Sequence, residues 1–211
     1  RQASFDEAPY DIPARLFAAA GHAVVSFDLP NHGEQVNAFG QGIDGFCAAF
    51  CAGVDPFVQF IEQGRAVLDA CLAQGLGEGG IVASGVSRAG YCALRLAAAD
   101  TRIQAVAGLA PVIDWRALRE FAAVRDQPAV AALALDHEAE ALAGRAIFLA
   151  IGNADLRVSS AACLRFGQRL LALEEAANQQ SSAIELHVIK AAGHSLDEHW
   201  RAAGAEFLLR Q

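Results

Sequence analysis

The sequence contains no methionine among its 211 residues, and no apolar run reaches the roughly 18 residues that a membrane-spanning helix needs. We therefore expect a soluble chain whose true start is processed, trimmed or missing. Charged residues make up only 19% of the chain against 54% hydrophobic residues, which excludes an intrinsically disordered protein. The 19 glycines and 6 prolines are spread along the sequence, which excludes collagen-like and low-complexity sequence.

Positive charge is scarce as well. Lysine and arginine total 16 against 24 acidic residues, which gives a net charge of −8. The phosphate backbone of a nucleic acid and the surface of an anionic membrane both attract basic proteins. We therefore expect neither a nucleic acid nor a membrane as a partner.

The five cysteines are odd in number and lie among alanine, leucine and phenylalanine. This setting favours buried free thiols over a disulfide framework, and it indicates a reducing, cytoplasmic location. No histidine or cysteine pair is spaced to complete a zinc site with Cys47 and Cys51. We expect neither a metal nor a cofactor.

Short apolar runs alternate with longer segments rich in alanine and leucine. The runs predict strands at 23–29, 80–86, 103–109, 147–151 and 184–189. The longer segments predict helices at 12–20, 55–74, 88–99, 158–177 and 199–210. Alternation of this kind is typical of parallel β-α-β units, so we predict an α/β fold whose mostly parallel sheet has helices on both faces.

Residues 114–144 interrupt this alternation with short helical segments and no strand pattern. We interpret them as a small helical insertion in a single domain that spans residues 1–211. Its apolar side chains are expected to form part of a pocket wall for a modest substrate: Trp115, Leu118, Phe121, Val130, Leu133 and Leu135.

A serine lies on the predicted turn between the strand at 80–86 and the helix at 88–99. Residues 84–91 read Ser-Gly-Val-Ser-Arg-Ala-Gly-Tyr, which places Ser87 on that turn. A nucleophile on such a turn needs small residues two positions before and after it, and Gly85 and Ala89 meet this need. By itself the pattern also fits a serine that only caps the helix.

Two further residues follow later strands and favour the catalytic interpretation. Asp155 follows the strand at 147–151, and His194 follows the strand at 184–189. The carboxyl ends of parallel strands meet at one edge of a sheet, so both side chains are expected near Ser87. A serine nucleophile requires a base and an orienting carboxylate, and the order Ser, Asp, His is the one expected for an α/β hydrolase.

On these motifs the sequence resembles the α/β-hydrolase superfamily. The stretch from Gly85 to Tyr91 is most similar to the prolyl-oligopeptidase and dienelactone-hydrolase branch, to which many esterases belong. Residues 24–33 (VVSFDLPNHG) and 107–114 (AGLAPVID) also match regions of this superfamily. The resemblance implies that Ser87 is the nucleophile, His194 the general base and acid, and Asp155 the orienting carboxylate.

The resemblance also implies that the backbone N–H of Arg88 is one oxyanion donor. The second donor of the superfamily comes from a loop before the helix expected at 12–20, where this sequence has no matching pattern, and Tyr10 is a lesser candidate for it. We therefore expect that N-terminal strands are missing and that the native protein continues upstream by roughly 40 to 70 residues.

Other residues compete for these roles. Asp114 is the alternative carboxylate partner of His194, while Asp197 and Glu198 are expected to begin the last helix and His199 to lie exposed on it. The segment 75–80 (GLGEGG) fits G-x-G-x-x-G but follows a helix and precedes a strand, so we interpret it as a loop and not as a dinucleotide site.

Together these features predict a serine hydrolase that cleaves a carboxylic ester or a related small acyl compound through an acyl-enzyme. Two alternatives stay open: a peptidase of the prolyl-oligopeptidase type, and a catalytically inactive hydrolase fold that serves as a binding module. A homodimer is also left open.

Overall fold

The structure is a computed structural model that describes residues 6–177 and 183–211. The chain divides into two compact units, of which the first ends at Gly79 and the second begins at Gly80.

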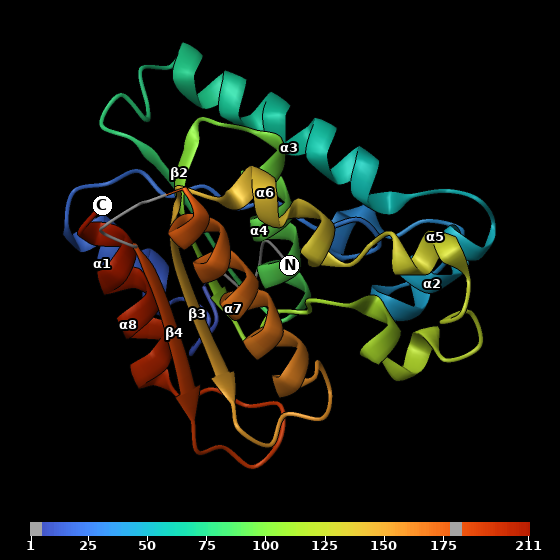
Figure 1. Ribbon diagram of the computed structural model, residues 1–211. Helices are drawn as coiled ribbons and strands as arrows, with labels where there is room; N and C mark the ends of the chain where they lie inside the picture. The colour runs from blue at the N-terminus through green and yellow to red at the C-terminus, as the bar shows by residue number, and fades with distance from the viewer. Residues whose placement is uncertain (1–5, 178–182) are drawn as a thin grey trace. The chain divides into compact units, whose positions relative to one another are not determined.

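The second unit contains a parallel sheet of four strands in the order β1-β2-β3-β4 (Figure 1). The strands are β1 (Ile81–Val86), β2 (Ile103–Leu109), β3 (Ala146–Gly152) and β4 (Ile184–Ile189). Every residue of β3 is buried, as is all of β2 except Gln104, which explains their nearly continuous apolar sequences. The predicted parallel α/β architecture is confirmed, and each of these strands lies within one residue of its predicted bounds.

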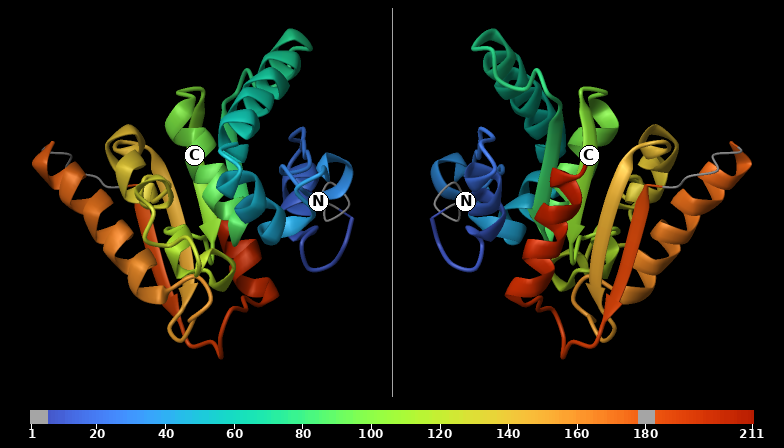
Figure 2. Two further views of the ribbon diagram at one scale, coloured as in Figure 1. Left: turned by 90° about the vertical axis from the view of Figure 1, so that its right-hand side faces the viewer. Right: turned by 90° about the vertical axis from the view of Figure 1, so that its left-hand side faces the viewer.

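Helices cover both faces of this sheet. The three long helices of the unit are α4 (Arg88–Ala99), α7 (Ser160–Ala176) and α8 (Glu198–Leu209). Figure 2 shows α7 and α8 on opposite sides of β3 and β4. Glycines permit close packing on each side: a Cβ atom at Gly167 of α7 would lie 2.8 Å from Leu186 of β4, and one at Gly204 of α8 would lie 3.3 Å from Leu109 of β2.

The segment between β2 and β3 consists of short helices, as predicted for residues 114–144. They are η3 (Trp115–Ala117), η4 (Arg119–Phe121), α5 (Pro128–Ala131), η5 (Leu135–Glu138) and α6 (Ala139–Leu142). The six apolar side chains that we expected to line a pocket are instead buried, with exposed fractions of 0–4%. They form the core of the insertion, because short helices that lack a strand must bury apolar side chains against one another to be stable.

The first unit contains α1 (Ile12–Ala19), η2 (Gly33–Gln35), α2 (Gly42–Cys51) and α3 (Pro56–Ala73). Phe46 of α2 packs with its ring centroid 5.3 Å from that of Phe57 at the start of α3 and 5.3 Å from that of His32. The helices predicted at 12–20 and 55–74 are confirmed, whereas α2 was not predicted.

The strand predicted at residues 23–29 is wrong, because the structure assigns no strand there. A strand is stabilised by hydrogen bonds to a neighbouring strand. Among the described residues of the first unit, no strand is available to pair with this segment. Apolar alternation alone could not reveal the lack of a partner.

No single helix within 6–177 and 183–211 has both the length and the apolar character of a membrane span. The bent pair of α2 and α3, which meet at 114°, passes that test together, by length and composition only.

None of the five cysteines, all of which lie within the described residues, forms a disulfide, and two of the five are buried. Cys92 and Cys163 lie in the core of the second unit, whereas Cys51 is exposed on α2. Its sulfur lies 4.0 Å from that of Cys47, one helical turn earlier.

Candidate active site

Ser87 occupies the turn between β1 and α4 in a strained backbone conformation. Its φ is 57° and its ψ is −120°, a region that residues with a side chain rarely adopt. Two backbone hydrogen bonds to the segment after β2 hold it there: the Ser87 N–H donates to Leu109 O at 2.8 Å, and the Val112 N–H donates to Ser87 O at 3.2 Å.

The small residues around Ser87 are required by close backbone contacts. A Cβ atom at Gly85 would lie 2.2 Å from the carbonyl oxygen of Ala89. A Cβ atom at Gly90 would lie 3.0 Å from Pro111 Cβ. The requirement for a small residue at position 85, predicted from the sequence, is confirmed.

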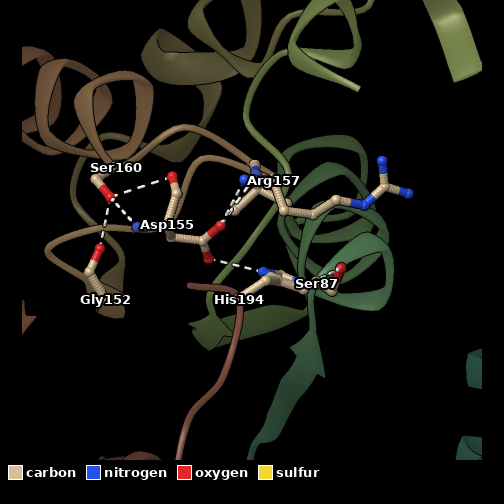
Figure 3. A network of polar contacts seen from close by, with 7 residues as sticks. Ser87, Gly152, Asp155, Arg157, Ser160 and His194 are labelled. Carbon is tan, nitrogen blue, oxygen red and sulfur yellow. Dashed lines mark hydrogen bonds and ion pairs between the residues drawn. The ribbon is translucent and has the colours of Figure 1, made fainter. Parts of the chain in front are cut away.

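The side chains of Ser87, His194 and Asp155 form a continuous hydrogen-bonded chain (Figure 3). His194 Nδ1 lies 2.7 Å from Asp155 Oδ2, and His194 Nε2 lies 2.9 Å from Ser87 Oγ. An ionised carboxylate can only accept, so Nδ1 of the neutral imidazole carries the proton and Nε2 accepts the serine O–H. This arrangement can move a proton from the hydroxyl to the imidazole.

Asp155 is buried, with 1% of its surface exposed. Its Oδ1 atom accepts the backbone N–H groups of Arg157 at 2.9 Å and Val158 at 3.2 Å, while Oδ2 faces His194. These hydrogen bonds offset the cost of burying a carboxylate. Its negative charge adds to burial at Cys163 on α7, where the pKa of the thiol rises to about 12.

The loop that carries Asp155 is closed by the hydroxyl of Ser160, the first residue of α7 (Figure 3). Ser160 Oγ accepts the Asp155 N–H at 3.0 Å and donates to Gly152 O at 2.5 Å. One side chain thus joins the end of β3, the acidic residue and the start of α7.

A second residue ties this loop to the loop that carries His194. The Asn153 N–H donates to Ile189 O at 2.7 Å, and Asn153 Oδ1 accepts the Ala191 N–H at 3.2 Å. The sequence reasoning missed both Asn153 and Ser160. Their signal in the sequence is the short distance from Asp155, and the partners of Asn153 lie on the loop of His194.

Arg88 is the first residue of α4, directly after Ser87. The N–H groups of a first helical turn point out of the helix and favour negative charge. An oxyanion at Ser87 would form beside this end of α4.

The competing residues take other places. Asp114 caps η3 and forms an ion pair with Arg116 at 2.7 Å, so Asp155, and not Asp114, lies against His194. Asp197 caps α8, which begins at Glu198, and His199 is exposed on it, all as predicted.

Residues 75–80 form a loop, as predicted. Tyr10 belongs to the first unit, whereas Ser87 belongs to the second. Within the two described ranges, no group of three or more His, Cys, Asp or Glu side chains could hold a metal ion.

No protein-family model and no curated protein matches the sequence, whereas several solved structures match the fold. The Thermus thermophilus protein TT1662 is 22% identical with a TM-score of 0.65, over 87% of this chain and 74% of that one. An uncomplexed acylaminoacyl peptidase from Pyrococcus horikoshii is 14% identical with a TM-score of 0.56, over 83% of this chain and 29% of the peptidase. A puromycin-hydrolyzing peptidase from Mycobacterium tuberculosis is 15% identical with a TM-score of 0.56, over 70% of this chain and 24% of the peptidase.

This chain therefore spans about a quarter of the length of the two peptidases and about three quarters of the Thermus protein. The likenesses cover 70–87% of this chain. The chain thus has the fold of the α/β-hydrolase superfamily, present here in part.

Proposed function

We propose that the chain is a serine hydrolase that cleaves a carboxylic ester or a related small acyl compound. The observation that carries this proposal is the Ser87–His194–Asp155 chain, with heavy-atom distances of 2.9 and 2.7 Å. The three side chains follow three different strands, and a nucleophile, a base and an orienting acid are the groups that acyl transfer needs.

In the first step Ser87 Oγ attacks the acyl carbonyl carbon while His194 Nε2 takes the hydroxyl proton. The carbonyl oxygen becomes an oxyanion beside the N-terminus of α4, where the Arg88 N–H is the proposed donor. His194 then gives its proton to the leaving oxygen, the ester bond breaks, and the acyl-enzyme remains.

In the second step water replaces Ser87 as the attacking group. His194 takes a proton from the water and returns it to Ser87 Oγ as the carboxylic acid leaves. Asp155 holds Nδ1 protonated and stabilises the imidazolium that forms twice in the cycle. The cycle consumes one water and needs no cofactor.

A fluorophosphonate probe and a substrate panel test the proposal. We expect covalent labelling of the full chain that is lost in Ser87→Ala, and turnover that falls by about four orders of magnitude in Asp155→Asn. Labelling that persists in Ser87→Ala would contradict the proposal.

Nitrophenyl esters of rising chain length, assayed beside aminoacyl amides, separate the alternatives. Preference for the amides would favour a peptidase of the prolyl-oligopeptidase type. A folded chain that neither reacts with the probe nor hydrolyses either set would indicate an inactive hydrolase fold that serves as a binding module.

A further inference from the structure

The helical insertion between β2 and β3 is attached to α4, the helix that follows Ser87. The Tyr91 hydroxyl donates to Leu133 O of the insertion at 2.9 Å, and Arg95 donates to the Tyr91 hydroxyl at 2.6 Å. The Trp115 ring packs edge-on against the Tyr91 ring at 5.1 Å. Tyr91 lies one turn after Ser87 and its N–H donates to Ser87 O at 3.1 Å, so this attachment lies next to the proposed nucleophile.

The same insertion is attached to the loop of Asp155 by a two-pronged ion pair. Arg157 Nη1 donates to Glu120 Oε2 and Arg157 Nη2 to Glu120 Oε1, both at 2.6 Å. The two side chains are 29% and 10% exposed, so solvent screens this pair less than a surface pair. Paired N–H donors on a planar carboxylate fix direction as well as distance.

Arg157 connects this ion pair to Asp155, the proposed orienting carboxylate. Its backbone N–H donates to Asp155 Oδ1 at 2.9 Å, while its guanidinium points away from the Asp155 carboxylate (Figure 3). The guanidinium is therefore fixed by Glu120, and the backbone of the same residue holds Asp155.

The loop is packed unevenly at this point, since Val158, directly after Arg157, is fully buried. Leu156, between Asp155 and Arg157, is 91% exposed. A hollow of about 370 Å³, lined in part by Asn153, Leu156 and Ser159, lies beside the loop. On the Leu156 side the loop therefore depends on its polar contacts, while the buried Val158 anchors its other side.

We propose that Glu120 is a positioning residue for the Asp155–His194 pair, and that it acts through the two-pronged bond to Arg157. The insertion thus sets the orientation of Asp155 from a residue that lies 35 positions earlier in the sequence. The kinetic form of this inference rests on the proposed hydrolase function. Its structural form, that Glu120 sets the geometry of the hydrogen bond between Asp155 and His194, does not.

Glu120→Gln removes the charge and one acceptor at nearly constant size. We expect kcat for a short nitrophenyl ester to fall by about 5- to 50-fold, because small misplacements of catalytic groups cost up to about 100-fold. KM should change little, since Glu120 is not proposed to touch substrate. Arg157→Lys keeps the charge but loses the fork, so its kcat should lie between those of the wild type and Glu120→Gln.

Arg102→Gln is the matched control. Arg102 also holds its carboxylate, Asp100, with two hydrogen bonds, from Nε at 2.9 Å and from Nη2 at 2.6 Å, and the side chains are 33% and 7% exposed. This pair lies just before β2, at the amino ends of the parallel strands, whereas Ser87 lies at their carboxyl ends. Arg102→Gln should lower the free energy of unfolding to a similar extent as Glu120→Gln and leave kcat unchanged. All variants are assayed well below their unfolding temperatures.

The NMR chemical shift of the His194 Nδ1–H proton, expected far downfield, tests positioning directly. It would not change if Glu120 contributed only to stability. We expect Glu120→Gln to shift or broaden this resonance and Arg102→Gln to leave it in place. If Glu120→Gln unfolds, the exchange variant E120R/R157E replaces it. That variant should recover most of the kcat and the resonance, because the pair is re-formed in reverse.

Unchanged kcat and an unchanged resonance in folded Glu120→Gln would overturn the inference, as would an equal loss of kcat in Arg102→Gln. If wild-type protein neither hydrolyses the esters nor reacts with the fluorophosphonate, the hydrolase proposal fails. The resonance then decides the structural form alone: a shift in Glu120→Gln but not in Arg102→Gln supports it, and no shift overturns it.

Discussion

At the scale of single residues, the strained backbone of Ser87 is the feature on which the site depends. A positive φ at a residue with a side chain costs about 1–3 kcal/mol and persists only where the surroundings enforce it. Here the φ of 57° is held by hydrogen bonds to Leu109 and Val112 and by the glycine at position 85. The strain presents Oγ to His194 and leaves the backbone N–H bonded elsewhere.

Gly85→Ala should therefore destabilise the protein by about 3 kcal/mol and abolish most fluorophosphonate labelling, because the new Cβ would lie 2.2 Å from Ala89 O. Urea unfolding measures the first effect and probe labelling the second. Gly79→Ala is the control, since nothing lies within 4 Å of its Cβ position. Equal stability of the two variants would contradict this account of the turn.

The cysteines should differ sharply in reactivity. Burial raises the pKa of both Cys92 and Cys163, to about 12 for Cys163, whereas Cys51 is exposed. Thiolates are the reactive form, so iodoacetamide at pH 8 should modify Cys51 in the folded protein and the two buried thiols only in urea. Peptide mass spectrometry gives the order, and early modification of Cys163 would show that its site opens to solvent.

At the scale of elements, β3 and α7 are joined by the loop that carries Asp155 (the acid loop). This junction holds more hydrogen bonds than its sequence suggests. Ser160 serves the loop through Asp155 and Gly152, while the preceding Ser159 serves only the helix, as its N-cap on the Ala162 N–H. Two adjacent serines thus have separable roles.

Ser160→Ala leaves the Asp155 N–H and the Gly152 carbonyl without their side-chain partner. It should lower the free energy of unfolding by about 1–3 kcal/mol and lower kcat. Ser159→Ala should lower stability by about 1 kcal/mol, the usual cost of losing a cap, without lowering kcat. Chemical denaturation and ester turnover of the two variants check both expectations, and equal kcat losses would refute the separation.

The bond between the insertion and the acid loop should weaken in acid. The hydrogen bonds from Arg157 hold the pKa of Glu120 below its usual value, so the folded state favours the ionised carboxylate. The resulting stability is present above the unfolded pKa of about 4.3 and is lost as the pH falls below it. The free energy of unfolding of the wild type should exceed that of Glu120→Gln by about 1–3 kcal/mol at pH 7, and this difference should disappear in acid. Urea unfolding at a series of pH values measures it.

At the scale of the whole molecule, the second unit was far more predictable than the first. In the second unit, long apolar strands pair with neighbours that are also next in sequence, so local pattern and tertiary pairing agree. In the first unit, residues 23–29 carry a strand pattern but form no strand. Helix α2, with glycines at positions 42 and 45, was missed because glycine weakens the helical signal.

The candidate site shows the same division. Ser87, Asp155 and His194 could be predicted because each follows a strand and because they occur along the chain in the order Ser, Asp, His that is expected for the superfamily. Glu120 and Asn153 could not, because their partners are set by how separate loops meet in space and by no spacing in the sequence. Ser160 could not, because a serine at the start of a helix is also what a helix cap requires.

The net charge of −8 belongs to the molecule as a whole and predicts the behaviour of the chain toward polyanions. Fluorescence anisotropy of labelled duplex DNA should show no binding even at low salt, because few cations are available to release the counterions of the phosphate backbone. Salt-sensitive binding there would reveal a basic patch that the net charge conceals.

The order β1-β2-β3-β4 also has an evolutionary reading. Three strand ends present the proposed reacting groups, and the end of β2 alone presents backbone that supports Ser87. The insertion begins at that end, so natural variation can lengthen or reshape it without displacing a reacting side chain from its own strand. Changes there would alter what surrounds the chemistry, and through Glu120 how firmly the acid is held, before they alter the chemistry itself.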